Sequence, residues 1–236
     1  MNAPGKASLI SIIIPVLDEA QGIISVLQAL QSFRQQHAEI IVVDGGSSDG
    51  TPRLAAPLAD QVTVSSKGRG CQMNAGAALA QGQVLLFLHA DTQLPRSALT
   101  LIDEAIRRGA NWGRFDVKID GNAQGLRLVA SMMNWRSRLT GIATGDQAIF
   151  VTQQAFAQVG GFADIPLMED IDFSSRLRAL SHPTCLAEKV ITSGRRWEKH
   201  GVMRTILLMW RLRLRFFFGA NPNELAREYG YAPREQ

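Results

Sequence analysis

The sequence predicts an α/β fold with a mostly parallel sheet and helices on both of its faces. Runs at 9–17, 40–43 and 84–88 have the length of strands and are almost entirely apolar, as strands buried on both faces are. Carboxylates follow these runs, at Asp18, Asp44 and Asp91. Because the carboxyl ends of parallel strands open onto one crevice, these acids predict a negatively charged ledge that suits a divalent metal and hydroxyl-rich ligands.

Helices alternate with these strands along the chain. Apolar residues recur at helical spacing after the first strand, and turns rich in glycine and serine separate later elements. The expected strands are 9–17, 40–44, 62–64 and 84–88, and the expected helices are 23–35, 51–58, 67–82, 97–108 and one that begins near residue 169. We expect one domain over 1–202 and a basic amphipathic helical tail over 203–236, packed on the domain or on a membrane.

Length and composition agree with one globular domain. A chain of 236 residues with 46% hydrophobic residues can bury a full core. Cys71 and Cys185 lack the spacing of a metal site, so we expect free thiols in a reducing compartment and a cytoplasmic protein. The apolar run 9–17 is too short to span a membrane and is interrupted by Pro15.

Positive charge is concentrated towards the C-terminus. From residue 194 onward the chain has nine basic and four acidic residues, a net charge of +5, whereas the first 193 residues have 16 basic and 17 acidic residues, a net charge of −1. This distribution argues against a nucleic-acid-binding protein. On a helix from 204 to 218, a stripe of Arg204, Arg211 and Arg215 lies opposite Ile206, Leu214 and Phe217.

Such a helix can cover the sheet, form a dimer seam or attach peripherally to an anionic membrane, which here would be the inner face of the cell membrane. The alternation at 212–215 also permits a strand.

The glycine-rich turns do not match a dinucleotide-binding fold. That fold needs a G-x-G-x-x-G turn directly after the first strand. Here the first turn reads PVLDE over 15–19, without glycine, and Asp44 alone does not replace a pyrophosphate loop. A dehydrogenase is therefore not favoured.

Six short motifs occur in a characteristic order: SIIIPVLDE at 11–19, IVVDGGSSDGT at 41–51, GCQMNAG at 70–76, LFLHAD at 86–91, GGF at 160–162 and ED at 169–170. Over about residues 9–200 the chain thereby resembles family 2 glycosyltransferases of the Rossmann-like GT-A fold. SGRRWE at 193–198 is similar to a bacterial subgroup whose genes often accompany radical-SAM proteins. The resemblance implies an inverting transferase that uses a nucleotide-diphosphate sugar, usually with Mg²⁺ or Mn²⁺.

Asp91 is the leading candidate for a metal ligand. It matches the last acid of the family's Asp-x-Asp motif, whereas the first position is His89, a departure from the usual ribose contact. An imidazole can contact a hydroxyl, bind the metal or hold a turn. By resemblance, His200 lies where several GT-A enzymes place a further metal ligand.

The resemblance also indicates a donor pocket. Asp44 is expected either to accept the imide N–H of uracil, which favours a uridine donor, or to cap its own turn. Basic side chains can form charge-assisted bonds with the diphosphate. The expected donor-binding residues are Pro15, Asp18, Glu19, Asp44, Lys67, Arg69, His89 and Arg196.

Asp170 is the expected catalytic base. Inversion by single displacement needs a carboxylate that removes the proton of the acceptor hydroxyl. The segment MEDIDF at 168–173 supplies three acids at a helix start, where acids also occur for capping reasons. The resemblance assigns the base to Asp170, with Glu169 and Trp197 as acceptor contacts and Asp172 as the fallback. The acceptor itself is unknown, and a lipid-linked molecule is one candidate.

The sequence therefore favours a hexosyltransferase, with two other classes still open. A nucleotidyltransferase could use a similar sheet and acid pair, but it should carry a glycine-rich basic first turn. A non-catalytic sugar-nucleotide or lipid-binding protein is compatible with His89 in the metal motif.

Overall fold

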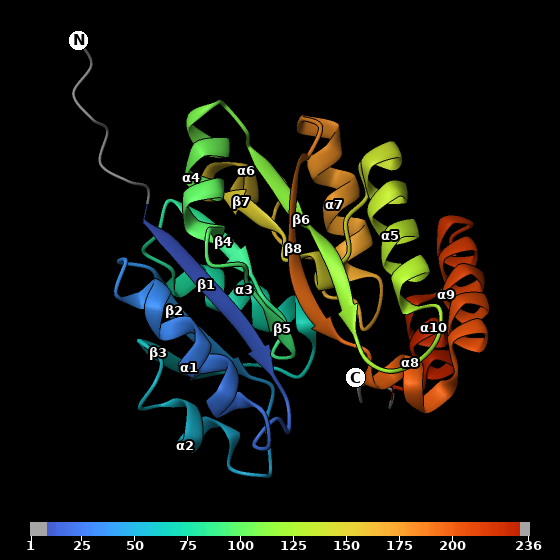
Figure 1. Cartoon of the computed structure of the whole chain (residues 1–236), viewed down its shortest axis with the longest axis horizontal. Coiled ribbons are helices and arrows are strands. Elements are labelled where there is room, and N and C mark those ends of the chain that lie inside the picture. Colours follow the sequence, from blue (N-terminus) through green and yellow to red (C-terminus); the bar gives the residue numbers. More distant parts are fainter. Residues whose placement is uncertain (1–8, 232–236) are drawn as a thin grey trace.

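A computed structural model, which describes residues 9–231, contains one eight-stranded mixed sheet in the order β3-β2-β1-β4-β7-β6-β8-β5 (Figure 1). The strands are β1 Ile10–Val16, β2 Glu39–Asp44, β3 Gln61–Val64, β4 Val84–Phe87, β5 Thr92–Gln93, β6 Trp112–Asp120, β7 Phe150–Thr152 and β8 Thr184–Ser193. The first four strands are parallel to one another, β7 is antiparallel to β4 and β6, and β5 is antiparallel to β8.

Helices cover both faces of this sheet. They are α1 Ile23–Arg34, α2 Thr51–Ala55, α3 Arg69–Leu79, α4 Ala98–Arg107, α5 Leu126–Thr140, α6 Gln153–Gln158, α7 Glu169–Leu180, α8 Arg195–His200, α9 Val202–Phe217 and α10 Pro222–Tyr229, with a 3-10 turn η1 at Gly145–Gln147. The helices α1, α2, α4 and α5 pack on one face, and α3, α6 and α7 on the other. The α/β fold and its first four strands are confirmed.

The isoleucines of β1 show how both faces become buried. Ile12 and Ile14 belong to the core that includes Leu27 of α1, whereas Ile13 belongs to the opposite core with Met73 of α3. All three isoleucines are fully buried. Burial of such a side chain stabilises the fold by about 1.5–3 kcal/mol, so every position of this strand favours the two-sided arrangement.

Glycines let helix α3 pack closely against the sheet at Gly76 and against the loop before α7 at Gly70. A Cβ on Gly76 would lie 2.4 Å from Ile13, and a Cβ on Gly70 would lie 2.5 Å from the carbonyl oxygen of Ala163. The helix ends at Leu79, three residues before the predicted end, because the chain then becomes extended and packs Gly82 against the backbone of the β1 region.

Two amide side chains of α3 fix the surrounding loops. Asn74 donates to the carbonyl oxygen of Phe162 and accepts from its N–H, both at 2.8 Å. Gln72 donates to the carbonyl oxygens of Val16 and Val43, also at 2.8 Å. The motifs at 70–76 and 160–162 are therefore one structural unit, which holds the ends of β1 and β2 beside the loop that leads into α7.

The C-terminal region forms two helices, so the strand considered at 212–215 is wrong. Leu212 of α9 and Leu225 of α10 are buried against Leu167 and Met168, in the loop before α7. The last five residues of the predicted tail lie outside the described residues. Within residues 9–231, no helix has the length and apolar content needed to cross a bilayer.

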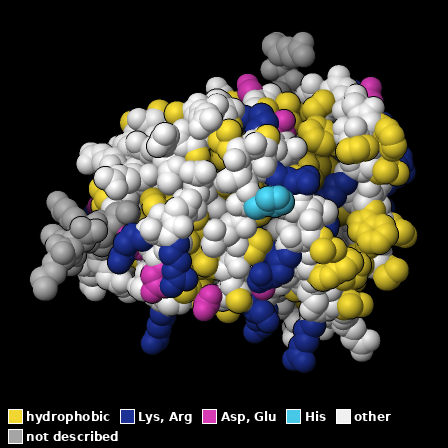
Figure 2. Space-filling model, turned by 90° about the horizontal axis from the view of Figure 1, so that it is seen from above, with side chains coloured by type: hydrophobic (Ala, Val, Ile, Leu, Met, Phe, Trp, Pro, Cys, Tyr) yellow, Lys and Arg dark blue, Asp and Glu magenta, His cyan; other side chains and the backbone are white. Residues whose placement is uncertain are grey.

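The predicted arginine stripe of α9 is only partly free to face a partner. Arg211 and Arg215 both form ion pairs with Glu228 of α10. Ile206, expected on the apolar side, packs against the main core. Apolar side chains are nevertheless exposed over this end of the molecule, where they form a large patch (Figure 2).

Replacing Asn74 with alanine should lower the free energy of unfolding by about 1–3 kcal/mol, because the backbone polar groups of buried Phe162 lose both partners. Urea denaturation measures this loss. Asn122→Ala, at an exposed loop position, is the control. Equal stability of the two variants would show that the two hydrogen bonds of Asn74 to the Phe162 backbone do not stabilise the loop.

Candidate active site

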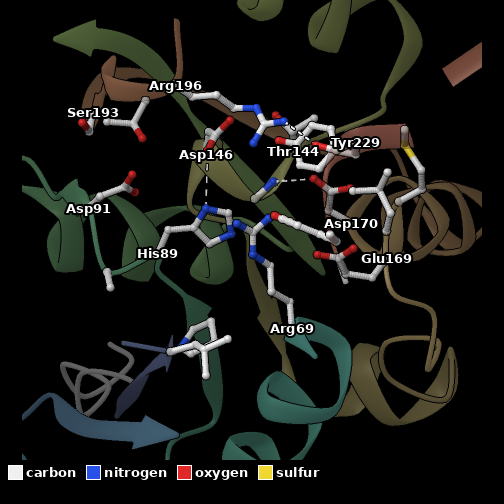
Figure 3. A pocket seen from close by; sticks show the side chains of 18 of the residues that line it. Arg69, His89, Asp91, Thr144, Asp146, Glu169, Asp170, Ser193, Arg196 and Tyr229 are labelled. Atoms are coloured by element: carbon white, nitrogen blue, oxygen red, sulfur yellow. Dashed lines mark hydrogen bonds and ion pairs between the residues drawn. The ribbon is translucent and has the colours of Figure 1, made fainter. Parts of the chain in front are cut away.

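A crevice of about 580 Å³ opens at the carboxyl ends of β1 and β4 (Figure 3). Ligand pockets of this kind typically have volumes of about 300–1,000 Å³. Its walls come from the ends of both strands, the η1 turn, the start of α7 and the helices α8 to α10. Of the residues predicted from the sequence, it is lined by Pro15, Glu19, Lys67, Arg69, His89, Asp91, Glu169, Asp170, Arg196 and Trp197.

Asp91 and Glu19 form an acidic edge on one side of the crevice. Asp91 follows β4, and its side chain is 33% exposed. Burial raises the pKa of Glu19, with Arg195 opposing the shift and Asp91 adding to it. The nearest side-chain nitrogen of Arg195 is 3.9 Å from the Asp91 carboxylate. Asp91 does not cap α4, which begins seven residues later.

This edge has the chemistry of a Mg²⁺ or Mn²⁺ site that is completed by a ligand. No group of three or more His, Cys, Asp or Glu side chains within residues 9–231 could hold a metal ion by itself. Mg²⁺ is commonly held by one or two carboxylates together with substrate phosphates and water, and Asp91 with Glu19 fits that pattern. His200 is exposed at the end of α8 and does not line the crevice, so the structure does not bring it to Asp91.

His89 is held by the η1 turn rather than by Asp91. Its Nδ1 lies 3.4 Å from a carboxylate oxygen of Asp146 (Figure 3). A Cβ on Gly145 would lie 2.3 Å from Nε2 of His89, so glycine is required for this close approach. Burial acts to raise the pKa of Asp146, but His89, Arg69 and Arg213 together lower it. Asp146 therefore stays ionised beside the imidazole.

Asp170 is fixed in the first turn of α7 and lines the crevice. One of its oxygens accepts from the backbone N–H of Gly145 at 2.8 Å, and the other accepts from the N–H of Ile171 at 2.7 Å. Both bonds orient the carboxylate while leaving lone pairs available. Asp172, the fallback base, instead bonds Arg176 at 2.9 Å and does not line the crevice.

Glu169 is the most strongly perturbed acid of the site. Its side chain is buried, and burial together with the negative charge of Asp170 raises its pKa to about 7, although Arg69 opposes the shift.

Met168, which precedes Glu169, has a left-handed backbone with φ of 72°. This conformation costs a residue with a side chain about 1–3 kcal/mol and directs the two acids toward the crevice.

Asp44 and Asp18 have structural roles in the turn after β2. Asp44 is 2% exposed and accepts from the N–H groups of Gly46 and Ser47 at 2.8 Å. Asp18 accepts from the N–H of Ser48 at 2.8 Å. Neither lines the crevice. These hydrogen bonds give Asp44 a turn-capping role, and donor binding by Asp44 and Asp18 stays a prediction.

The remaining predicted residues lie on the outer wall. Arg196 stacks on Tyr229, with its guanidinium carbon 3.5 Å from the ring centroid, and donates to the Tyr229 carbonyl oxygen at 3.0 Å. Trp197 lines the crevice and also packs against the main core. Lys67 and Arg69 flank Gly68, and Arg69 extends toward Glu169 (Figure 3).

Sequence reasoning missed several residues that line the crevice, among them Asp146, Arg213 and Tyr229. Asp146 lies in the polar segment TGDQ at 144–147, which is followed by the apolar run AIFV at 148–151, and this change from polar to apolar residues could have drawn attention to it. Arg213 and Tyr229 carry no comparable signal, because they reach the crevice only through the packing of α9 and α10.

The chain matches the family model for glycosyl transferase family 2 over residues 11–158. This match spans more than half of the chain and includes β1 to β4, His89 and Asp91. The chain belongs to glycosyl transferase family 2.

Two curated family 2 relatives are similar over parts of their length. Glycosyltransferase AglE of Haloferax volcanii is 32% identical over 91 residues, covering 35% of this chain and 30% of AglE. An undecaprenyl-phosphate 4-deoxy-4-formamido-L-arabinose transferase of Pseudomonas syringae is 28% identical over 151 residues, covering 59% of this chain and 43% of the relative. The chain thus matches less than half the length of each.

Solved structures show the same fold. The mannosyltransferase PcManGT from Pyrobaculum calidifontis, in complex with GDP-Man and Mn²⁺, has a TM-score of 0.60 at 17% identity, covering 80% of this chain and 57% of that one. TarS 1-349 from S. aureus, in complex with UDP-GlcNAc, has a TM-score of 0.64 at 18% identity, covering 78% and 58%. These two structures support the GT-A fold, whereas the family model and the two curated relatives support the glycosyltransferase class.

Glu169→Gln should stabilise the protein at pH 8 by about 1–3 kcal/mol relative to wild type, with little difference at pH 4. Between the ordinary value of 4.5 and the folded value of about 7, the folded state holds more protons than the unfolded state. Wild-type stability therefore falls as pH rises through this window, and glutamine removes that loss.

Denaturation of both proteins across this pH range measures the difference. Glu188→Gln, at an exposed position of β8, is the control and should give a flat difference. A flat difference for Glu169→Gln as well would contradict the assigned pKa.

Proposed function

We propose that the protein is an inverting glycosyltransferase that moves a sugar from a nucleotide-diphosphate donor, with UDP-sugars favoured, to an acceptor hydroxyl. The observation that carries this proposal is the pairing of two carboxylates on opposite walls of one crevice. Asp91 lies at the end of β4, and Asp170 is fixed at the start of α7. A family 2 transferase needs a site for the donor diphosphate and a base for the acceptor, and these two residues fit those needs.

Asp91 and Glu19 would hold the Mg²⁺ or Mn²⁺ together with the donor diphosphate. The bound ion supplies positive charge that stabilises the leaving diphosphate. Lys67, Arg195 and Arg196 line the same crevice and can bind phosphate oxygens by charge-assisted bonds, each contributing about 1.5–3 kcal/mol. His89 would contact a hydroxyl of the donor rather than the metal, and its turn toward Asp146 supports this role.

Asp170 would act as the general base. Its two backbone hydrogen bonds hold the carboxylate still while it takes the proton of the acceptor hydroxyl as that oxygen attacks C1 of the sugar. Attack from the side opposite the leaving diphosphate inverts the configuration at C1. Glu169, with its raised pKa, can donate a hydrogen bond to an acceptor oxygen at neutral pH.

A lipid-linked acceptor with a phosphate group fits the far end of the crevice. Arg213 lines the crevice, and its neighbour Arg136 lies on α5. Burial lowers the pKa of Arg213, and burial with repulsion from Arg213 lowers that of Arg136 to about 10. Asp170 opposes both shifts, and a bound anion would stabilise the two guanidinium groups further. The Pseudomonas syringae relative is named for an undecaprenyl-phosphate substrate.

The cellular setting belongs to the same proposal. The protein would be cytoplasmic, and a lipid acceptor would bring the enzyme to the inner face of the cell membrane. Membership of the subgroup that accompanies radical-SAM genes rests only on residues 193–198.

Asp91→Ala should weaken UDP binding on the order of tenfold to hundredfold in Mn²⁺ and remove its dependence on the metal. Titration calorimetry with and without Mn²⁺ tests this. Asp120→Ala, an exposed aspartate at the end of β6, should bind as wild type does. Metal-dependent binding that survives in Asp91→Ala would remove Asp91 from the ligand set.

Asp170→Asn should lower turnover about 10²–10⁴-fold while donor affinity changes little, because loss of a base affects the chemical step. Release of nucleoside diphosphate from a panel of UDP- and GDP-sugars, with water or added acceptor, measures turnover. Asp172→Asn is the matched control on the same helix and should retain activity. If Asp172→Asn loses activity and Asp170→Asn does not, the base is Asp172.

A further inference from the structure

Two neighbouring helices expose continuous apolar rows. On α5 the row is Leu128, Met132, Trp135 and Leu139, and on α9 it is Met203, Leu207, Trp210, Leu214 and Phe217. Each of these side chains is at least 41% exposed, and Trp135 and Trp210 are 66% and 60% exposed. The steps of three and four residues place each row along one face of its helix. Apolar side chains gathered in this way mark an interaction surface.

The opposite faces of the same helices are already used. Leu126, Val129 and Ala130 of α5 are buried in the main core. On α9, Leu212 is buried against α10, while Met209 and Arg213 line the crevice. The exposed rows are therefore not faces that the described fold could bury by a small shift, since each helix already packs its other side.

The two rows lie side by side. An added Cβ on Gly125, just before α5, would lie 3.7 Å from Val202 at the start of α9, and further along Arg136 of α5 neighbours Arg213 of α9. Figure 1 shows the two helices together at one end of the molecule, and Figure 2 shows apolar side chains gathered over that end. Together they form one surface, the α5/α9 face, defined by the nine side chains of the two rows.

The charges on these helices identify the partner. There are three arginines on α5 and four on α9, and neither helix contains an Asp or Glu. Arg127 and Arg204 are exposed and take part in none of the ion pairs found within residues 9–231. A second copy of the same face would bring like charges together, whereas an anionic surface would neutralise them. Tryptophan is also enriched where proteins meet the bilayer interface.

We propose that the α5/α9 face is a docking surface for an anionic membrane, with Trp135 and Trp210 in the headgroup region and Arg127 and Arg204 beside lipid phosphates. Membrane contact by an exposed helical face needs no helix that spans the bilayer.

Docking on this face would bring the crevice to the lipid. Met209 and Arg213 line the crevice from the other side of α9, so its wall would lie about one helix diameter, roughly 10–12 Å, from the membrane surface. A lipid-linked acceptor could then reach Asp170 without leaving the bilayer. This last step rests on the proposed function, whereas membrane docking itself does not.

Vesicle binding tests the docking surface independently of catalysis. The wild-type protein should co-sediment with vesicles of phosphatidylcholine and phosphatidylglycerol at low salt, and bind pure phosphatidylcholine much more weakly. Trp135→Gln/Trp210→Gln should lower the partition coefficient on the order of tenfold or more. Arg127→Gln/Arg204→Gln should lower it to a similar degree and reduce its salt dependence.

Matched controls lie away from the α5/α9 face, on α1, α2, β3 and directly after α4. Ile24→Gln/Val64→Gln removes two exposed apolar residues, and Arg53→Gln/Arg108→Gln removes two exposed arginines; both should bind vesicles as wild type does. Unchanged UDP binding in all variants would show that the crevice is intact.

Failure of wild type to bind anionic vesicles, or equal binding by the tryptophan variant, would overturn the proposal. So would a wild-type dimer that the tryptophan variant converts to monomer without any vesicle binding. If vesicles bind but no donor is turned over, the docking surface stands and the proposed transfer reaction fails.

Discussion

Burial of both faces of the sheet is the constraint on which the rest of the structure depends. With helices above and below, β1 and β4 are apolar apart from Ser11 near the start of β1, and polar side chains gather where the strands stop. Glu19, His89 and Asp91 therefore meet at one edge, although they come from different parts of the chain. Asp44 also ends a strand, but its carboxylate accepts hydrogen bonds from its own turn and does not line the crevice.

The site also depends on one cation, Arg69, that affects two acids whose pKa values shift in opposite directions. Arg69 is close enough to influence both Asp146 and Glu169, but the outcomes differ: the pKa of Asp146 is lowered and that of Glu169 is raised. The difference arises because Glu169 is more deeply buried and has Asp170 beside it, whereas Asp146 faces His89. Pairs of acids driven apart in this way can hold an ionised and a protonated carboxyl in one crevice at the same pH.

The first half of the molecule could be predicted from its sequence, because its strands and helices are adjacent in the chain and each has its own periodicity. Asp91 and Asp170 could be placed by motif, and both line the crevice. Helix α5 and strands β6 and β8 were not anticipated: their residues mix polar and apolar types, and β6 pairs with β8 only after a long excursion. The hydrogen bonds that orient the Asp44 carboxylate within its turn could not be predicted from the motif alone.

The residues that complete the crevice come very late in the chain. Tyr229 and Tyr231 line the same crevice as Pro15 and Glu19, so segments far apart in the described sequence are needed to form it. During synthesis on a ribosome, the parallel strands and α3 could pack as soon as they emerge, but the crevice would remain open on one side until α10 had left the exit tunnel. Helix α10 thus completes the crevice. A nascent chain whose α10 is still inside the exit tunnel would have a folded sheet but an incomplete site.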